Sequence, residues 1–296
     1  MIKKSKNIKD IQIQAGRPLV LDGATGTQLI ERGIEQDNSL WTSLANLNSP
    51  DIVQKVHEDY ICAGADIITT NTFRTNPAAT EKYGKVFSEK MVEAALQIAF
   101  DAAAGRDIII AGCNPPAEDC YQQERKLSEN ELKNNHQEHI TLLWEYGSDI
   151  ILNETQSHLD EILIICKICS SMQIPFIISM LIDENLKLLS GEYVNEVFSK
   201  IKKFNPAAIA INCVDPGIYK KFTELVNIPD NFGFYLNMGL SSHHLGVISG
   251  TITPDDFVET VKPFLSDKIL FVGGCCGSSP AHIKKLRKHI DSLYRN

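Results

Sequence analysis

Two adjacent cysteines, Cys275 and Cys276, follow a short apolar run and two glycines near the C-terminal end of the sequence. Neighbouring cysteines are poor disulfide partners for each other because the geometry of that bond is demanding. Both sulfurs can face one metal ion if the backbone bends, and the flanking glycines permit such a bend. A third thiol from another strand end would complete a three-sulfur zinc site with one open position, the arrangement of catalytic zinc.

Cys213 is the candidate for the third thiol. The apolar segments 207–211 and 269–272 are predicted strands, and the cysteines lie just beyond their C-terminal ends. In a parallel barrel such strand ends open onto one face, so cysteines far apart in sequence can meet there. Taken alone, Cys213 reads as a small hydrophobic core residue. The glycine-flanked pair changes that balance, and we predict a zinc site formed by all three cysteines.

The other cysteines give weaker signals. Cys166 and Cys169 form a C-x-x-C pair, but their neighbours are isoleucines at helical spacing, which favours packing in the core. Cys113 follows a predicted strand and faces the same end of the barrel, either close to the metal or there by chance. Cys120 lies in a polar loop and has no recognisable partner. None of these four is predicted to be a metal ligand.

Polar residues at other predicted strand ends surround the cysteines. Asp22 and Glu154 each follow a predicted strand, where they either cap a turn or bind a cation such as an α-ammonium group. Asn237 also ends a strand, and it orients a ligand, approaches the metal or closes a turn. His243 and His244 compete for a ligand position, although paired histidines in a loop more often face solvent.

Three thiolates would leave a zinc site with a net charge of about −1 before any substrate binds. Such a centre polarises a carbonyl group poorly, but it can hold a fourth thiolate whose sulfur stays electron-rich. A free thiol, with a pKa of about 8.5, is only slightly ionised at neutral pH, whereas metal binding deprotonates it. The predicted chemistry is therefore alkyl transfer to a substrate thiol by positioning and nucleophile activation.

Eight apolar segments, mostly alternating with predicted helices, position these residues. They are residues 18–21, 66–70, 107–111, 149–152, 176–181, 207–211, 232–236 and 269–272. Continuous apolar strands alternating with helices indicate a parallel sheet covered by helices. Eight such units in 296 residues fit a closed α/β (β/α)₈ TIM barrel, with a doubly wound sheet as the alternative. No G-x-G-x-x-G or P-loop turn follows a strand, so dinucleotide binding is not indicated.

Several helix starts are also visible. Ser128 with Glu131 is a capping-box signature, and Ser49 and Thr253 each precede a proline as predicted N-caps. Residues 194–204 are predicted to be one helix, and residues 1–10 a polar leader.

Composition limits the class of protein. The net charge of −8 argues against nucleic acid as the main partner, and no apolar run is long enough for a signal peptide or a membrane span. Eight cysteines without a secretion signal indicate reduced thiols and a cytoplasmic protein. No change of composition divides the chain, so residues 1–296 are expected to form a single domain. The sequence does not determine the oligomeric state, and a homo-oligomer is one possibility.

Five short segments match one known family when they are taken together. They are residues 21–27 (LDGATGT), 69–73 (TTNTF), 153–155 (NET), 211–213 (INC) and 273–276 (GGCC). Over nearly the whole chain these segments resemble the zinc-dependent homocysteine S-methyltransferases. Residues 39–41 (SLW) resemble the stand-alone branch that uses S-methylmethionine. The resemblance implies that Cys213, Cys275 and Cys276 are the zinc ligands and that homocysteine binds as the fourth.

The resemblance also implies a substrate site. Asp22, Gly23 and Glu154 match positions that hold the amino-acid end of homocysteine, and Thr25 lies in the same motif. Asp22 and Glu154 are accordingly predicted to be catalytic as well as substrate-binding. Asn237 matches an asparagine near the metal.

Two departures from the family bear on the methyl donor. Members that use betaine carry a tyrosine where Arg74 stands in this sequence, so betaine is disfavoured. The Ser-x-Gly-Pro stretch of several branches is replaced by residues 112–116 (GCNPP), which leaves the donor pocket undefined.

The main hypothesis is transfer of a methyl group from a small onium donor, S-methylmethionine first, to homocysteine, which yields methionine. A separate methylated corrinoid protein is an alternative donor. A zinc hydrolase on the same barrel is a second hypothesis and would need a general base such as Glu154 or His243. A non-catalytic thiol- or zinc-binding protein is a third.

Overall fold

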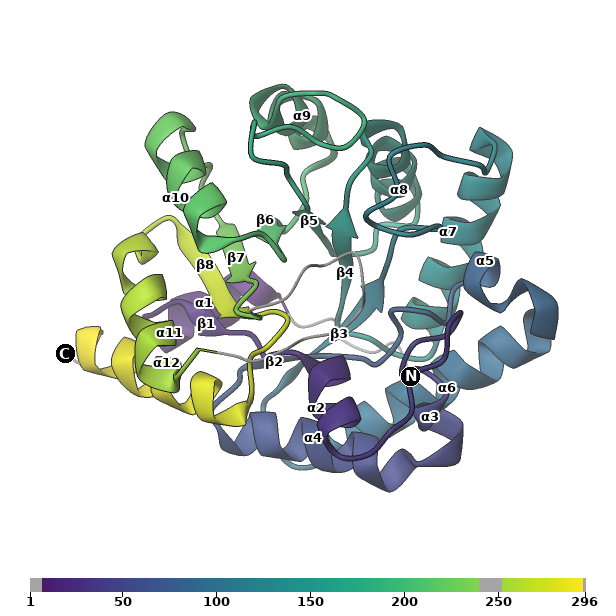
Figure 1. The fold of residues 1–296 in the computed structure, drawn as a ribbon, viewed down its shortest axis with the longest axis horizontal. Coiled ribbons are helices and arrows are strands. Elements are labelled where there is room, and N and C mark those ends of the chain that lie inside the picture. The colour runs from purple at the N-terminus through teal and green to yellow at the C-terminus, as the bar shows by residue number, and fades with distance from the viewer. Residues whose placement is uncertain (1–6, 240–251, 295–296) are drawn as a thin grey trace.

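The computed structural model describes residues 7–239 and 252–294, and its helices surround a central set of strands (Figure 1). Eight parallel strands follow the order β1-β8-β7-β6-β5-β4-β3-β2. Leu21 pairs with Ile67, and the Asp22 N–H donates to the Ile67 carbonyl at 3.0 Å, which joins β1 to β2. The sheet therefore closes into a TIM barrel as predicted, and the doubly wound alternative is wrong.

The strands lie close to their predicted positions. They are β1 (Leu19–Val20), β2 (Ile67–Thr69), β3 (Ile109–Asn114), β4 (Ile150–Gln156), β5 (Phe176–Met180), β6 (Ala208–Asn212), β7 (Phe232–Leu236) and β8 (Ile269–Gly274). Strands β3 and β4 run three and four residues beyond their predicted ends, to Asn114 and Gln156. The predicted ends were too early because the additional strand residues are mostly polar and do not continue the apolar run. Inside the barrel these polar groups bond one another, as Asn114 Nδ2 does with Asn153 Oδ1 at 2.8 Å.

The helices cover the outside of the barrel. They are α1 (Ile8–Ala15), α2 (Thr25–Glu31), α3 (Ala45–Asn48), α4 (Pro50–Cys62), α5 (Pro77–Thr80), α6 (Lys85–Ala103), α7 (Glu129–Glu145), α8 (Leu159–Ser171), α9 (Val194–Ile201), α10 (Pro216–Leu225), α11 (Pro254–Val261) and α12 (Pro280–Leu293), with 3₁₀ turns at Glu81–Tyr83, Lys202–Phe204 and Lys262–Phe264. No helix in the described residues has the length and apolar character needed to cross a membrane.

The predicted helix starts are largely correct. Ser128 and Glu131 form the capping box of α7, and the Thr253 hydroxyl accepts the Asp256 N–H at the start of α11. Ser49 precedes α4 but makes no side-chain capping bond, because the fixed backbone of Pro50 already begins the helix. The predicted helix 194–204 is instead α9 followed by a 3₁₀ turn, which ends where Asn205 adopts a left-handed conformation.

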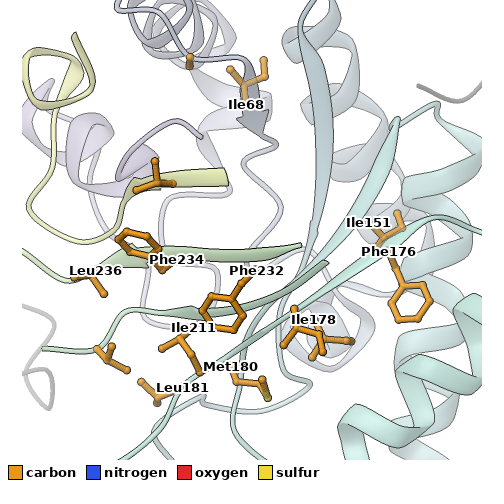
Figure 2. Close-up of a cluster of buried hydrophobic side chains, with 14 of the residues drawn as sticks. Ile68, Ile151, Phe176, Ile178, Met180, Leu181, Ile211, Phe232, Phe234 and Leu236 are labelled. Carbon is orange, nitrogen blue, oxygen red and sulfur yellow. The ribbon is translucent and has the colours of Figure 1, made fainter. Parts of the chain in front are cut away.

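Two apolar layers arise from the alternation of side chains along each strand. Side chains such as Ile109, Ile150 and Phe271 fill the barrel interior. Their neighbours along the strands point outward and pack under the helices, as Figure 2 shows for Ile151, Ile178, Phe232 and Phe234, among others. The barrel is thus a packed core that leaves only its strand ends for chemistry.

Helix α1 belongs to this core rather than to a polar leader. Ile8 is 2% exposed and joins the interior layer, and Ile11 packs against the same layer. Gly16 ends the helix in a left-handed conformation, with its N–H bonded to the carbonyls of Gln12 and Ile13. The lysine-rich composition of the first residues concealed this short amphipathic helix.

An ion-pair cluster supports the β1–β2 junction. The Asp66 carboxylate accepts hydrogen bonds from Arg17 Nη1 at 2.7 Å, Arg287 Nη1 at 3.1 Å and the Val20 N–H at 2.8 Å. Asp291 in turn pairs with both arginines. The carboxylate therefore ties the first strands to the C-terminal helix α12.

Candidate metal and substrate site

The sulfur atoms of Cys213, Cys275 and Cys276 lie within 4.8 Å of one another at the C-terminal end of the barrel. Cys213 Sγ and Cys276 Sγ are 3.7 Å apart. Tetrahedral zinc with Zn–S bonds of about 2.3 Å places two sulfurs about 3.8 Å apart. The structure thus brings together the three predicted thiols at a spacing that fits a single ion.

Strand β7 holds the two cysteine-bearing segments in place. The Cys213 N–H donates to the Tyr235 carbonyl at 3.0 Å, and the Cys275 N–H donates to the Leu236 carbonyl at 3.0 Å. The Cys276 carbonyl accepts the Met238 N–H at 2.9 Å. Cys213 adopts a left-handed backbone with φ of 56°, an unusual conformation for a non-glycine residue.

The glycines around the pair act differently from the prediction. Gly273 and Gly274 complete β8 and do not form the bend. A Cβ on Gly273 would lie 2.8 Å from the Asp22 carbonyl oxygen, and one on Gly274 would lie 2.3 Å from Ser278 Oγ. Gly277 makes the turn, with φ of 80°. The two predicted glycines therefore permit close packing of strand ends, and the left-handed turn lies after the cysteines.

The electrostatics of the trio favour a bound cation. Interaction with the Cys213 sulfur, together with burial, raises the pKa of Cys275 and Cys276 well above the usual thiol value. Three thiols this close cannot all ionise without a positive charge between them. Metal binding supplies that charge and deprotonates thiol ligands. The donor set of three soft sulfurs suits zinc, and these residues fit such an ion.

The loop 115–128 contributes two residues that the sequence did not connect to the site. Tyr121 places its hydroxyl 3.6 Å from Cys213 Sγ, and Cys120 is buried in the same pocket. Burial, followed by the proximity of Cys213, raises the pKa of Tyr121, so the phenol stays protonated. Cys120 was predicted to have no recognisable partner; burial raises its pKa, and the neighbouring Cys213 adds to the shift. The loop lacks periodicity, so no sequence pattern indicated these contacts.

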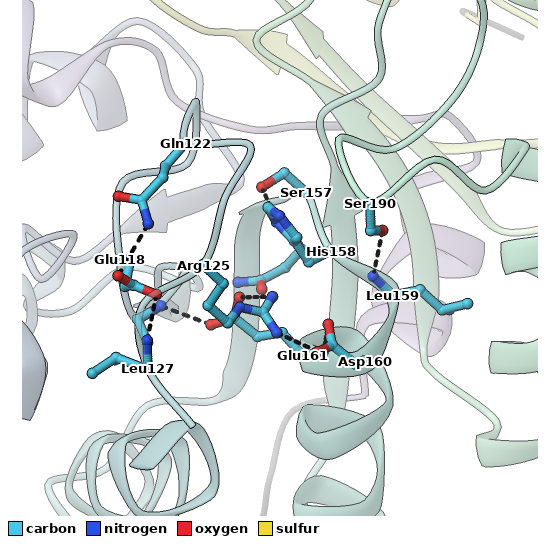
Figure 3. Close-up of polar contacts among 12 residues, drawn as sticks. Glu118, Gln122, Arg125, Leu127, Ser157, His158, Leu159, Asp160, Glu161 and Ser190 are labelled. Carbon is cyan, nitrogen blue, oxygen red and sulfur yellow. Dashed lines mark hydrogen bonds and ion pairs between the residues drawn. The ribbon is translucent and has the colours of Figure 1, made fainter. Parts of the chain in front are cut away.

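Figure 3 shows how the loop is held. Arg125 pairs with Asp160 and Glu161 at the start of α8, and Glu161 Oε1 accepts the Ala117 N–H at 2.7 Å. Glu118 accepts the N–H groups of Lys126 and Leu127 at 2.9 and 3.1 Å. Glu161 Oε1 also lies 2.7 Å from the Nε2 atom of the buried His136. Both ends of the loop are therefore fixed to the barrel wall.

Asp22 lies at the end of β1 with 1% of its surface exposed. Its carboxylate accepts the Thr69 N–H at 2.8 Å and the Thr69 hydroxyl at 2.6 Å. Burial raises the pKa of Asp22 to about 8 despite these bonds. The next residue, Gly23, leaves no room for a side chain, because a Cβ at this position would lie 2.6 Å from Ser278 Oγ. The Thr25 hydroxyl is buried and has no hydrogen-bond partner among the described residues.

Glu154 faces the same pocket from β4. Its Oε2 atom accepts a hydrogen bond from Cys113 Sγ at 3.0 Å. Burial raises the pKa of Glu154 to about 7, and the neighbouring Cys213 sulfur adds to the shift. Cys113 therefore contacts a predicted substrate-binding residue rather than the metal cluster. Neither Asp22 nor Glu154 pairs with a cation among the described residues, so the pocket contains two buried acids and no counter-ion for them.

Asn212, next to Cys213, is a buried residue that the sequence did not single out. Its Oδ1 atom accepts the Thr155 N–H at 3.1 Å and the Ser179 hydroxyl at 2.6 Å. Its Nδ2 atom donates to the Thr155 hydroxyl at 2.8 Å. Asn212 thus ties the end of β6 to the end of β4, next to Glu154. Asn212 and Thr155 belong to the INC and NET segments of the sequence, but only the fold shows that these two segments are hydrogen-bonded to each other.

The remaining residues singled out in the sequence lie in the pocket, outside the described residues, or in the core. Asn237 is buried and lines the pocket, and its Oδ1 atom accepts the Gly239 N–H at 2.9 Å. His243 and His244 lie outside the described residues. Cys166 and Cys169 are fully buried in the helix–barrel core, as predicted from their apolar neighbours.

The pocket has a volume of about 360 Å³. The aromatic side chains of Trp41 and Phe73 form part of its rim. Trp41 and Phe73 pack edge to face with ring centroids 5.9 Å apart. The Trp41 ring covers Gly26, where a Cβ would lie 2.3 Å from the indole. The Arg74 guanidinium lies over the Phe73 ring, 5.6 Å from its centroid. The thiol cluster and the buried acids thus lie in one cavity below this rim.

Comparison with known proteins agrees with this geometry. The homocysteine S-methyltransferase model matches residues 19–290, which is most of the chain. The chain belongs to the homocysteine S-methyltransferase family. The family assignment rests on a match that includes all three cysteines and both buried acids. It agrees with the predicted resemblance, and the activity of the family is methyl transfer to homocysteine.

Relatives and solved structures extend this homocysteine S-methyltransferase assignment. Homocysteine S-methyltransferase 3 of Zea mays is 27% identical, over 94% of this chain and 91% of its own length. Selenocysteine Se-methyltransferase of Brassica oleracea var. italica is 23% identical, over 97% of this chain and 92% of its own. The metallated form of the homocysteine methyltransferase MmuM from Escherichia coli has the same fold. Its TM-score is 0.78 at 22% identity, over 96% of this chain and all of that one.

Proposed function

We propose that this protein transfers a methyl group from a small onium donor, S-methylmethionine first, to the thiolate of homocysteine bound at a zinc site. The observation that carries the proposal is the joint presence of three clustered thiols and two buried acids in one cavity. Cys213, Cys275 and Cys276 would hold the zinc. When bound, the ion lowers the pKa of a fourth thiol and holds it as a thiolate. Free thiols of this kind persist in a reducing compartment such as the cytoplasm.

The two buried acids provide the binding site for the acceptor's amino group. Asp22 and Glu154 have pKa values raised by burial, to about 8 and about 7, and both lack a cation. An α-ammonium group between them would favour their ionised forms and offset the cost of burial. The orphaned Thr25 hydroxyl donates to the same substrate. These contacts fix the acceptor so that its sulfur reaches the thiol cluster, which is a contribution of position.

The transfer itself is a displacement at carbon. The acceptor sulfur forms a bond to the donor's methyl carbon as the bond from that carbon to the donor's sulfonium sulfur breaks. The electron pair of the broken bond stays on the donor, which leaves as a neutral thioether. Positive charge on the donor is thus lost in the step, and no proton needs to move at the methyl group. Asn212 and Tyr121 hold the acidic and thiol parts of the cavity in position.

The test is an activity screen with homocysteine and separate methyl donors. Zinc-loaded protein is mixed with S-methylmethionine, betaine or a methylcorrinoid, and methionine is measured with and without a chelator. We expect methionine from the sulfonium donor only, and loss of turnover on chelation. Turnover that survives chelation would contradict the metal-dependent mechanism. Hydrolysis of simple esters or amides by the zinc-loaded protein would favour a hydrolase instead.

A further inference from the structure

Arg74, in the pocket rim between β2 and α5, is a partly buried cation without a counter-ion. No carboxylate of the described residues forms an ion pair with it, and every aspartate and glutamate of the chain lies in the described part. Among the described residues, the other partly buried arginines are all paired with carboxylates: Arg17, Arg32, Arg125 and Arg287. An arginine left unpaired in a cavity is available to an anionic ligand.

The guanidinium of Arg74 is held in place with donors to spare. Its Nη1 atom donates to the Glu118 carbonyl at 3.3 Å, and its Cζ atom lies over the Phe73 ring, 5.6 Å from the centroid. A guanidinium has five N–H donors in a planar fork, which matches the two oxygens of a carboxylate. The hydrogen bond to Glu118 and the cation–π contact with Phe73 hold the side chain before any ligand arrives. The site is therefore organised in advance for a planar anion.

The charges of the cavity narrow the identity of that anion. Arg74 is the only lysine or arginine among its described lining residues, against four acids: Asp22, Asp37, Asp119 and Glu154. A purely cationic donor would be repelled by Arg74, and the guanidinium already covers one face of Phe73. A donor that carries a carboxylate as well as its onium centre removes this conflict. Its carboxylate pairs with Arg74 while the onium group faces the acids and the remaining aromatic surface.

We propose that Arg74 binds the carboxylate of the methyl donor, so that the donor class is a sulfonium amino acid. This inference rests on the proposed methyl transfer. The acceptor has its own anchors on β1 and β4, whereas Arg74 lies after β2 beside Trp41 and Phe73. A tyrosine in the position of Arg74 would offer a ring to the onium group instead of a charge to the carboxylate.

The test uses one pair of donors and two substitutions. S-methylmethionine and its carboxamide, in which a neutral amide replaces the carboxylate, are compared by steady-state kinetics with wild type, Arg74→Gln and Arg106→Gln. Arg106 is an exposed arginine without a carboxylate partner and lies outside the pocket. For wild type we expect the amide to have a KM about ten- to a hundredfold higher, the usual range for a lost charged hydrogen bond.

Arg74→Gln should raise the KM of S-methylmethionine by a similar factor and leave that of the amide within about twofold. The KM of homocysteine should not change, and Arg106→Gln should behave as wild type. A rise confined to the KM of homocysteine would assign the anion site to the acceptor and overturn the inference. Equal KM values for acid and amide in wild type would overturn it without any substitution.

Calorimetric binding of the same two compounds to the zinc-loaded protein separates this inference from the proposed function. Preference for the acid that Arg74→Gln abolishes, with no methionine formed from any donor, would support the anion site and refute the methyl transfer. Methionine formation without any preference for the acid would refute the anion site alone. Failure of both compounds to bind would refute both.

Discussion

Two pairs of buried or partly buried acids in this barrel have opposite surroundings. Asp66 and Glu161 lie in the barrel wall, and each is bound by arginine or histidine side chains. Asp22 and Glu154 lie in the pocket and have no such partner among the described residues. The first pair supports the fold, whereas the second is poised for a ligand that brings the missing charge.

The pKa values express this contrast. Burial opposes ionisation of Glu161, but hydrogen bonds from His136 and Ala117 and the charge of Arg125 keep its pKa below the usual value. Burial dominates at Asp22 and Glu154 and raises their pKa to about 8 and about 7. Glu161 therefore differs in ionisation from Asp22 and Glu154 because only Glu161 has cations nearby.

Backbone strain occurs in both regions and includes residues of the pocket. Seven non-glycine residues of the described chain have positive φ, and three of them line the pocket: Trp41, Thr155 and Cys213. Such conformations cost about 1–3 kcal/mol each and persist only where the surroundings enforce them. Asn212 enforces the one at Thr155 through two hydrogen bonds, and a third bond joins Asn212 to Ser179. Strain and uncompensated charge thus occur together at the site, and paired charges hold the wall around it.

The largest effect is expected when the thiols of the two regions are compared. Cys276→Ala removes one of three sulfurs around the proposed ion. The affinity for zinc and the rate of methyl transfer should both fall by about a thousandfold or more. Cys169→Ala, in the apolar wall, should keep stoichiometric zinc and lower only the free energy of unfolding, by about 1 kcal/mol. Metal analysis and denaturant unfolding measure the two outcomes. Zinc retained at one equivalent by Cys276→Ala would contradict the assignment.

The acids give the next effect. Glu154→Gln removes a charge that the acceptor's ammonium group needs, and kcat/KM for homocysteine should fall about a hundredfold with little change in stability. Glu161→Gln breaks a buried ion pair and should lower the free energy of unfolding by about 3 kcal/mol. Equilibrium unfolding and steady-state kinetics on both variants test the distinction. If Glu154→Gln were the less stable of the two, the contrast between pocket and wall would be wrong.

Much of the fold was predictable because barrel strands are apolar on both faces. All eight strands begin within two residues of the predicted start, and β7 (Phe232–Leu236) matches at both ends. The convergence of Cys213 with Cys275 and Cys276 followed from topology alone, since all strand ends of a parallel barrel share one face. The helix α1 was missed because the lysine-rich composition of the first residues concealed its short amphipathic pattern.

The contacts around the cysteines were not predictable in the same way. Tyr121 and Cys120 reach Cys213 only because Arg125 and Glu118 fix the intervening loop, and neither anchor has a sequence signature. The role of Asn212 was hidden for a related reason. Its partners Thr155 and Ser179 lie on other strands, and their bonds depend on the register between strands rather than on local spacing.

A pH dependence tests the ionisation of the pocket acids directly. The raised pKa values of Glu154 and Asp22 mean that both groups gain protons below about pH 7 and pH 8 in the free protein. An ammonium group binds only their ionised forms, so affinity should increase as pH rises through these values. Methionine, the expected product, reports this without a thiol that titrates. Its inhibition constant should fall more than tenfold between about pH 6 and pH 8.5.

Glu154→Gln is the matched control for that titration. It removes the step near pH 7 and, because Glu154 raises the pKa of Asp22, shifts the remaining step below pH 8. The wall acid Glu161, whose pKa is lowered by its contacts with His136, Ala117 and Arg125, should contribute no step in this range. An inhibition constant that is independent of pH in wild type would show that the two carboxyls do not bind the ammonium group.

The smallest effect is expected for zinc affinity, at the point where the loop 115–128, anchored to the barrel wall, reaches the cysteines of the pocket. Tyr121→Phe removes the hydroxyl that lies 3.6 Å from Cys213 Sγ and leaves the ring in place. Once Cys213 is a thiolate, that hydroxyl donates to it and orients it, so zinc affinity should fall about tenfold. Competition with a metal indicator dye measures the loss. Tyr146→Phe, on the outer surface beside Glu89, should not change zinc affinity. Equal zinc affinity in Tyr121→Phe and wild type would mean that Tyr121 only fills space, and that the wall does not act on the thiols through this loop.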